Sequence, residues 1–217
     1  MVRLPMIAPL VAVLTLTALA HEADAGARRS RPLKTGQINC WNQNGTEIAC
    51  AGTGQDGELQ RGEPRAYLDL GDGTIRDQRT ALMWEKLSDD YSIHDKDNTF
   101  TWTEAFSVKI AMLNTPPCFA GFCDWRLPNR LELETLFNLG TKNPAVSAPF
   151  NTGCALGCTV LTCSCTAFSY SGGYYYWSSS TYMDSRQNAW LVNFNVGNVF
   201  SGSKFSSYYV RAVRGGS

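Results

Sequence analysis

The residues best suited to recognising a ligand gather near the C-terminus. Seven of the nine tyrosines follow residue 169, and serine, glycine and asparagine surround them. Tyrosine offers a large contact area at small entropic cost, and the small polar residues supply adaptable hydrogen bonds. The same composition is also typical of a β-rich core edge with serine turns. The candidate ligand-binding residues are Tyr174, Tyr176, Ser179, Tyr182, Asp184, Asn193, Asn195, Ser206 and Tyr208.

An acidic loop is a candidate calcium site. It carries Asp89, Asp90, Asp95 and Asp97, and calcium takes roughly six to eight oxygen ligands in flexible geometry. The spacing differs from that of an EF-hand because the central glycine and the closing glutamate are missing. The alternative is that these carboxylates only cap turns.

Eight cysteines predict a disulfide framework, because an even count in an exported protein favours disulfides. Cys40 and Cys50 flank a hairpin, and Cys118 and Cys123 would close a loop that follows Pro116-Pro117 and contains Gly121. Four more crowd into one short stretch and are expected to pair among themselves. A zinc knuckle is the alternative for these four. They are Cys154, Cys158, Cys163 and Cys165.

Catalytic groups are sparse. The two histidines are His21 and His94, too few for a histidine-rich zinc site. The Gly-x-Ser-x-Gly motif of a serine hydrolase does not occur in the sequence. We therefore expect no enzyme activity. The formal net charge of +0 and the lack of a long basic stripe disfavour a nucleic-acid partner.

The N-terminus has the pattern of an export signal. Arg3 precedes a short apolar run from Ala8 to Ala20, and small residues at 23 and 25 suit cleavage. We expect a signal peptide over residues 1–25, a basic linker over 26–34, and a protein that is secreted or lies in the periplasm or cell envelope. The apolar run is too short to serve as a transmembrane segment.

The remainder divides into a hairpin extension (residues 35–64), with a turn at Asn44-Gly45, and a larger domain (residues 65–217). In that domain we expect a strand over 66–70 and a second leading from Ile75 to Trp84. Two helices follow, one capped at Thr101 and one beginning near Asn129. Strands then run through residues 190–195 and 208–213. This order predicts an α+β fold with helices against an antiparallel sheet.

The side chains that should pack the core follow from periodicity. In the first helix they are Trp102, Ala105, Phe106, Ile110 and Leu113. In the second they are Leu131, Leu133, Leu136 and Phe137, with Gly140 as the stop signal. In the C-terminal strands, Trp177 and Trp190 are expected to be buried.

Several dense motifs, taken in order, resemble a bacterial family. They are AYLDLGDGTIRDQRTALMWEK (66–86), SIHDKDNTFTWTEAF (92–106), FCDWRLPNRLELETLF (122–137) and the tail with YYYWSSSTY, AWLVNFNVGNVF and YYVRAVRG (174–215). Together they resemble the Lcl C-terminal domain family, named for a collagen-like adhesin, over about residues 35–216.

The resemblance implies a C-type-lectin-like α+β fold, with the first and last strands paired and two helices on the sheet. The family's adhesin binds sulfated polysaccharide, so the resemblance also implies glycan recognition. Fold alone does not supply function. The sugar-binding triplets of calcium-dependent lectins, such as Glu-Pro-Asn, do not occur in this sequence.

Beside a purely structural role in the cell envelope, three other functions stay open. The ligand of the C-terminal face is a surface protein in one of them. In another, the chain is an enzyme related to formylglycine-generating and sulfatase-modifying proteins, which share the lectin-like fold and would need a reactive cysteine pair. In the third, the tyrosine-rich tail is a variable region rewritten by a diversity-generating retroelement.

Overall fold

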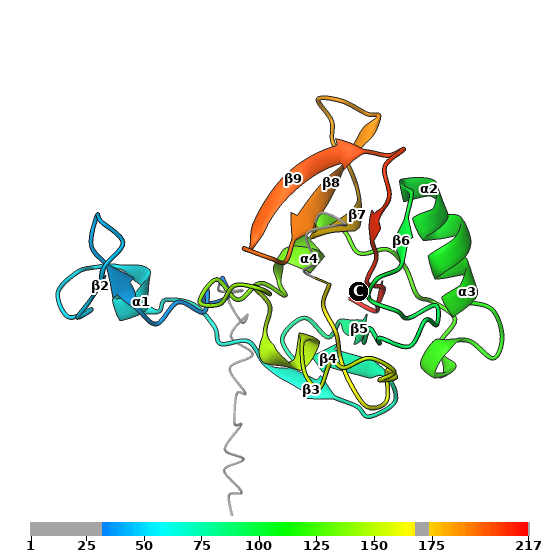
Figure 1. Cartoon of the computed structure of the whole chain (residues 1–217), viewed down its shortest axis with the longest axis horizontal. Coiled ribbons are helices and arrows are strands. Elements are labelled where there is room, and N and C mark those ends of the chain that lie inside the picture. The colour runs from blue at the N-terminus through cyan, green and yellow to red at the C-terminus, as the bar shows by residue number, and fades with distance from the viewer. Residues whose placement is uncertain (1–31, 168–173, 217) are drawn as a thin grey trace, which may run out of the picture. The chain divides into compact units, whose positions relative to one another are not determined.

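The computed structural model (Figure 1) describes residues 32–167 and 174–216. The predicted signal peptide (residues 1–25) and linker residues 26–31 lie outside this part of the chain. Within the described ranges, no helix is long and apolar enough to cross a membrane.

Short helices and strands alternate with long loops. The strands are β1 (Cys40–Trp41), β2 (Glu47–Ile48), β3 (Tyr67–Asp69), β4 (Thr74–Asp77), β5 (Met83–Glu85), β6 (Thr99–Phe100), β7 (Tyr175–Thr181), β8 (Asn188–Asn193), β9 (Asn198–Ser203), β10 (Tyr208–Tyr209) and β11 (Val213–Arg214). The α-helices are α1 (Asp56–Leu59), α2 (Trp102–Glu104), α3 (Ala111–Leu113) and α4 (Arg130–Glu134). A π-helical segment (Ala105–Ile110) joins α2 to α3, and two 3₁₀ turns cover Phe119–Gly121 and Ala148–Phe150.

The strands of the described residues form three sheets. The hairpin β1-β2 stands alone, a second sheet has the order β11-β5-β4-β3, and the third has the order β6-β10-β7-β8-β9. All pairs are antiparallel except β10 with β7. The predicted α+β class is confirmed. The last strand, β11, pairs with β5, so the implied pairing of first and last strands is wrong.

The predicted final strand over residues 208–213 is split between two sheets. β10 pairs with β6 and β7, whereas β11 pairs with β5. Between them the buried Arg211 donates to the Glu85 carbonyl, and the Ala212 N–H bonds to the Glu85 carboxylate at 2.9 Å. The Ala212 N–H is thus bonded to a side chain rather than to a neighbouring strand, although the Ala212 carbonyl still accepts from the Glu85 N–H at 3.0 Å. The strand is interrupted at this point.

The predicted strand from Ile75 to Trp84 is likewise two strands, β4 and β5. Asp77 accepts from the Arg79 N–H at 2.8 Å and from the Thr80 hydroxyl at 2.7 Å. An aspartate that bonds backbone two residues ahead stabilises a turn. The chain therefore reverses after Asp77.

The N-terminal hairpin forms as expected from the sequence. Cys40 pairs with Ile48 across β1 and β2, and the Cys40–Cys50 disulfide closes the hairpin. The Asn42 side chain accepts from the N–H groups of Asn44 and Thr46, which fixes the turn.

Residues 102–113 form one continuous helical segment. Its capping box is confirmed, because Thr101 and Glu104 bond reciprocally. Ala105 is buried, but Phe106 is 37% exposed and Lys109 is only 1% exposed. Ile110 and Leu113 are buried with Ala105, as predicted, so Phe106 is the predicted core residue that the structure exposes. The π-helical segment also places a lysine in the interior.

The second predicted helix is shorter than expected. Asn129 and Glu132 form its capping box, as predicted, but α4 ends at Glu134 rather than near Gly140. Leu133 is buried, whereas Leu131 is 68% exposed. One short turn of helix can bury only a narrow stripe of side chains.

Strand β7 separates two clusters of buried side chains. Tyr176 belongs to the cluster around Trp84 and Phe150. Its neighbour Trp177 belongs to the cluster around Trp125. Successive side chains of a strand point to opposite faces, so β7 is covered on both sides.

Candidate ligand-binding site

A pocket of about 330 Å³ lies where the start of α2 meets the turn after β9. Its lining combines apolar rings, hydroxyl groups, an amide and an ammonium group. The lining residues are Thr101, Trp102, Thr103, Gln187, Lys204 and Phe205.

The capping box positions the aromatic wall of this pocket. Thr101 begins the helix, and its N–H donates to Glu104 at 2.9 Å. This backbone hydrogen bond is the largest cause that lowers the pKa of Glu104, and the hydrogen bond from the Thr101 hydroxyl to the same carboxylate is the second. Trp102 is then fixed from two directions, because its indole N–H donates to the Ser178 carbonyl at 3.0 Å, and its ring meets that of Phe106 edge-on.

Lys204 provides the positive charge. Its ammonium lies 4.1 Å from the centre of the Trp102 ring, an attractive cation–π geometry. It donates to the Thr181 hydroxyl at 2.9 Å and to the Arg186 carbonyl at 3.1 Å. An ammonium has three donors, so one donor of Lys204 remains for a ligand.

On its open side the pocket has exposed side chains that are free to contact a ligand. Phe205 is 84% exposed, so its ring is a flat apolar surface in contact with water. Thr103 and Gln187 are exposed, and the structure gives neither side chain a hydrogen-bond partner among the described residues. The pocket therefore offers an apolar face, neutral donors and acceptors, and one cation within a small volume.

Two of the ligand residues predicted from sequence are buried. Tyr176 is 0% exposed, and its hydroxyl accepts from the Ala167 N–H at 2.7 Å. Burial raises its pKa. Asn193 is 5% exposed and accepts from the Asn195 N–H at 2.7 Å. The prediction that Tyr176 and Asn193 face a ligand is wrong, because β7 and β8 are covered on both faces.

The exposed and half-buried aromatic side chains also lie on two faces rather than one. Trp190 pairs with Ser201 and the adjacent Leu191 with Phe200, so Trp190 and Phe200 point to opposite faces. Tyr182 packs against Trp190, with ring centres 4.9 Å apart. Tyr208 lies on the Phe200 face, in contact with Tyr175 and Trp177. The expected single exposed face is therefore wrong.

Tyr182 and Trp190 form a small surface group. The guanidinium of Arg130 lies 4.6 Å from the Trp190 ring centre, and Asp184 is 3.5 Å from the Tyr182 hydroxyl. Trp190 is half-buried, whereas Trp177 is buried as predicted.

Two of the other predicted ligand residues, Ser179 and Ser206, form backbone hydrogen bonds. The Ser179 N–H donates to the Pro128 carbonyl at 2.8 Å, and the Ser206 N–H donates to the Ser203 carbonyl at 2.9 Å. Tyr174 and Asn195 are half-buried near the ends of β7 and β8. Ser206 follows Phe205 directly but does not line the pocket.

The acidic loop brings together three of its four aspartates. Asp89, Asp95 and Asp97 lie close enough to share one ion, whereas Asp90 turns away to bond Ser88 and Ser92.

Lys96 forms ion pairs with two aspartates of this cluster. Lys96 Nζ lies 3.2 Å from Asp89 and 2.6 Å from Asp97. Asp95 accepts from the Tyr91 N–H at 2.6 Å and from the Asp97 N–H at 2.8 Å. An ammonium among the carboxylates opposes a divalent cation, so these contacts favour the turn-capping alternative. Calcium binding stays a prediction.

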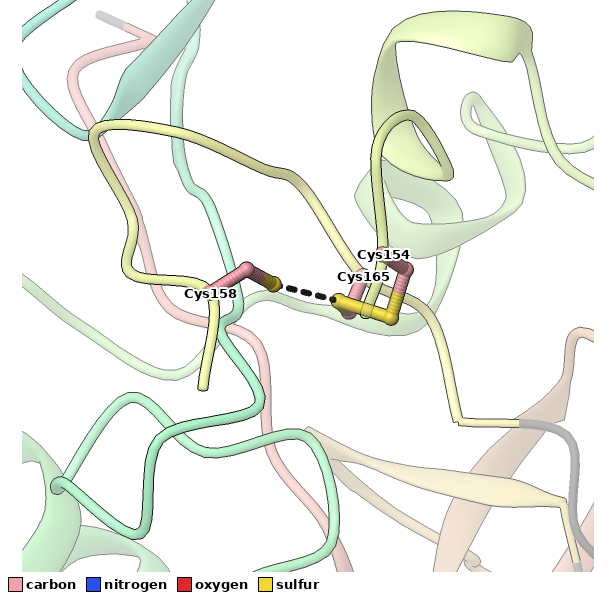
Figure 2. A group of neighbouring side chains, drawn as sticks. All are labelled: Cys154, Cys158 and Cys165. Atoms are coloured by element: carbon pink, nitrogen blue, oxygen red, sulfur yellow. Dashed lines mark hydrogen bonds between the residues drawn. A yellow bond between two sulfur atoms is a disulfide. The ribbon is translucent and has the colours of Figure 1, made fainter. Parts of the chain in front are cut away.

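All eight cysteines form disulfides, and the two predicted pairs, Cys40–Cys50 and Cys118–Cys123, are confirmed. The last four pair among themselves, as predicted, in the arrangement Cys154–Cys165 and Cys158–Cys163. Figure 2 shows the first of these bonds, with Cys158 Sγ 3.8 Å from Cys165 Sγ. Oxidised sulfurs are not the thiolates that zinc requires, so the disulfide interpretation holds.

The sequence matches the family described as Lcl C-terminal domain over residues 73–214. The chain belongs to the Lcl C-terminal domain family. The match contains every residue that lines the pocket and all strands from β4 to β11. It is shorter than the resemblance seen in the sequence, because the hairpin and β3 lie outside it. No curated protein sequence matches the chain.

Sequence reasoning missed the pocket residues of this Lcl C-terminal domain. Helical spacing assigns Trp102 to the core, and the Lys204-Phe205 turn carries no motif. One signal was available. Phe205 is a large apolar residue between a lysine and two serines in a turn, where the alternation of buried and exposed side chains in a strand does not operate.

Proposed function

We propose that this chain is an exported, non-catalytic binding module that recognises a glycan bearing sulfate or carboxylate groups. The observation that carries the proposal is the exposed Phe205 ring beside the fixed ammonium of Lys204. A sugar ring has an apolar face that can stack on an aromatic side chain, and its charged substituents match an ammonium.

The remaining pocket groups fit the same ligand. The Thr103 hydroxyl and the Gln187 amide can exchange hydrogen bonds with sugar hydroxyls. Membership of the Lcl C-terminal domain family supports an adhesin-like module, and in this proposal the domain has a C-type-lectin-like fold. Four disulfides support an oxidising compartment, either secreted or periplasmic.

The alternative functions have weaker support. An enzyme of the formylglycine-generating type needs a reactive thiol pair, and every cysteine is in a disulfide. A retroelement-diversified surface needs its variable residues outside, whereas Tyr176 and Asn193 are buried. A surface-protein ligand remains the alternative to a glycan.

The test is calorimetric titration with heparin and with chemically desulfated heparin, using the native chain and two variants. Phe205→Ala removes the apolar platform, and Tyr91→Ala is the matched control because Tyr91 is also 84% exposed but lies in the acidic loop. We expect binding by the native chain and by Tyr91→Ala, and about tenfold weaker binding by Phe205→Ala. Equal binding by all three chains would contradict the assignment of the pocket.

A further inference from the structure

Strand β9 forms one outer edge of the five-stranded sheet. Among the described residues it pairs with β8 on one side only, and Figure 1 shows it at the margin of this sheet. A free edge presents unpaired N–H and C=O groups that can accept another strand.

The register identifies which groups are free. The Lys204 N–H donates to the Gln187 carbonyl at 2.9 Å, so this residue pair is hydrogen-bonded. Hydrogen-bonded pairs alternate along an antiparallel ladder, and the pair Leu191–Phe200 is therefore bonded as well. Val199 and Ser201 consequently direct their N–H and C=O groups away from β8.

The usual protections of an edge strand are missing from β9. Its sequence, NVFSGS, contains no charged residue and no proline, and its six residues pair with β8 in unbroken register. Natural edges are commonly shortened, bulged, charged or interrupted by proline to prevent pairing. β9 is thus suited to accept a strand.

The side chain at the centre of β9 is apolar and exposed. Phe200 is 43% exposed, although one edge of its ring contacts Tyr175 at 5.4 Å between centres. An antiparallel partner strand would cover the remaining surface of this ring.

We propose that two copies of this chain pair antiparallel along β9, about a two-fold axis through Phe200. In this register Val199 of each copy bonds with Ser201 of the other, and the two Phe200 rings are direct cross-strand neighbours. Facing aromatic side chains stabilise an antiparallel pair. The two five-stranded sheets become one continuous sheet.

The second copy is favoured over a different partner because the edge is complementary to itself. Val199 and Ser201, whose backbone groups point away from β8, are equally distant from Phe200. A single two-fold rotation about Phe200 therefore places each Val199 opposite the Ser201 of the other copy. The nearest charge on the chain after the strand, Lys204, lies four residues from the axis. The two lysines are then eight residues apart along the strands, about 27 Å, and screened from each other at physiological salt.

The dimer has a consequence for ligand binding. The two-fold axis is perpendicular to the sheet, so both copies of the Lys204 pocket open on the same face, and one long polymer can reach both. This consequence rests on the proposed function, whereas the dimer itself does not. A chain that dimerises without binding heparin would contradict the proposed function and this consequence, but not the dimer.

The first experiment measures mass by sedimentation equilibrium on the full chain with its four disulfides intact. We expect a concentration-dependent dimer. Ser201→Pro removes an outward N–H, which a free edge tolerates in the monomer, and should raise the dimer dissociation constant at least about tenfold. The matched control Ser201→Thr keeps the N–H and should dimerise as the native chain does. A monomeric native chain, or a Ser201→Pro variant that dimerises equally well, would overturn the proposal.

The second experiment tests the register. Phe200→Cys places two thiols opposite each other at the axis, so mild oxidation should link the copies covalently. Val196→Cys is the control, because Val196 is 50% exposed but lies in the turn before β9, four residues from the axis and out of disulfide reach of its own copy. Equal cross-linking of both variants, or no cross-linking of the Phe200→Cys variant, would show that the pairing is wrong.

Discussion

Lys109 and Glu85 form an ion pair in the protein interior, with Lys109 Nζ 2.5 Å from Glu85 Oε1. The side chains are 1% and 0% exposed. The same carboxylate lies 2.7 Å from His94 Nδ1 and accepts from the Ala212 N–H at 2.9 Å. Glu85 thereby connects the helix of residues 102–113, the acidic loop and the C-terminal segment.

Removing one partner of this pair should be strongly destabilising. We expect Lys109→Met to lower the free energy of unfolding by about 3–5 kcal/mol, because it leaves a buried carboxylate without its main cation. Urea denaturation followed by fluorescence measures the change. Lys142→Met is the control, since Lys142 is exposed, and should change stability by less than about 0.5 kcal/mol.

The double variant Lys109→Met, Glu85→Gln tests whether the effect belongs to the pair. Removing both charges should recover part of the loss, because no uncompensated ion remains in the interior. A double variant that loses the sum of the two single losses would indicate that the residues act independently.

Stability should fall in acid through Glu85. Burial alone would raise the pKa of Glu85, but the Lys109 ammonium and the His94 bond outweigh it and hold the pKa at about 2, against 4.5 for the free side chain. A depressed pKa contributes stability above about pH 4.5, which is lost as the pH falls towards 2. The contribution is at most about 3 kcal/mol.

The measurement is the free energy of unfolding between pH 6 and pH 2, and the double variant at residues 85 and 109 is the comparison. Its curve should be flatter over the acid range, with a residual slope from other carboxylates whose pKa is lowered, such as Glu132. Parallel curves for the two proteins would exclude Glu85 as a source of the acid sensitivity.

Lys204 should distinguish charged from neutral glycans. We expect Lys204→Gln to weaken binding of heparin about tenfold and to leave any binding of dextran, a polysaccharide without charged groups, nearly unchanged. The salt dependence of heparin affinity should also decrease, because one cationic contact is lost. Titration at two salt concentrations measures both effects. Equal weakening towards both polymers would mean that Lys204 only shapes the pocket.

The cysteine-rich loop should depend on its outer disulfide. Replacing Cys154 and Cys165 with alanine opens a loop of sequence separation 11 and should lower the free energy of unfolding by about 3 kcal/mol. Removing Cys158–Cys163, with a separation of 5, should cost less, because the smaller loop constrains the unfolded chain less. Thermal unfolding of both variants gives the order, and the reverse order would contradict this account.

Local signals predicted local structure well. The capping boxes at Thr101 and Asn129 form as expected, because their groups are three residues apart. The hairpin disulfide and the pairing within the last four cysteines were also accessible, since short separations restrict the possible partners. The motifs in order identified the family.

The candidate site was much less accessible. Successive side chains of a strand alternate, so Tyr175 and Trp177 share one face of β7 and Tyr176 lies on the other. The sequence gave no sign that both faces are covered. Pocket residues from the start of α2 and from the turn after β9 lie about a hundred positions apart in sequence. Their proximity depends on the order of strands in the sheet.

By itself, therefore, the sequence determined the α+β class, the helix starts, the hairpin and the family, because each depends on residues near one another or on motifs in fixed order. Tertiary structure decided which tyrosines are buried, and it placed a lysine in the core and assembled Phe205, Lys204 and Trp102 around one pocket. Those outcomes depend on which faces meet, and burial is a property of the packed molecule rather than of any single segment.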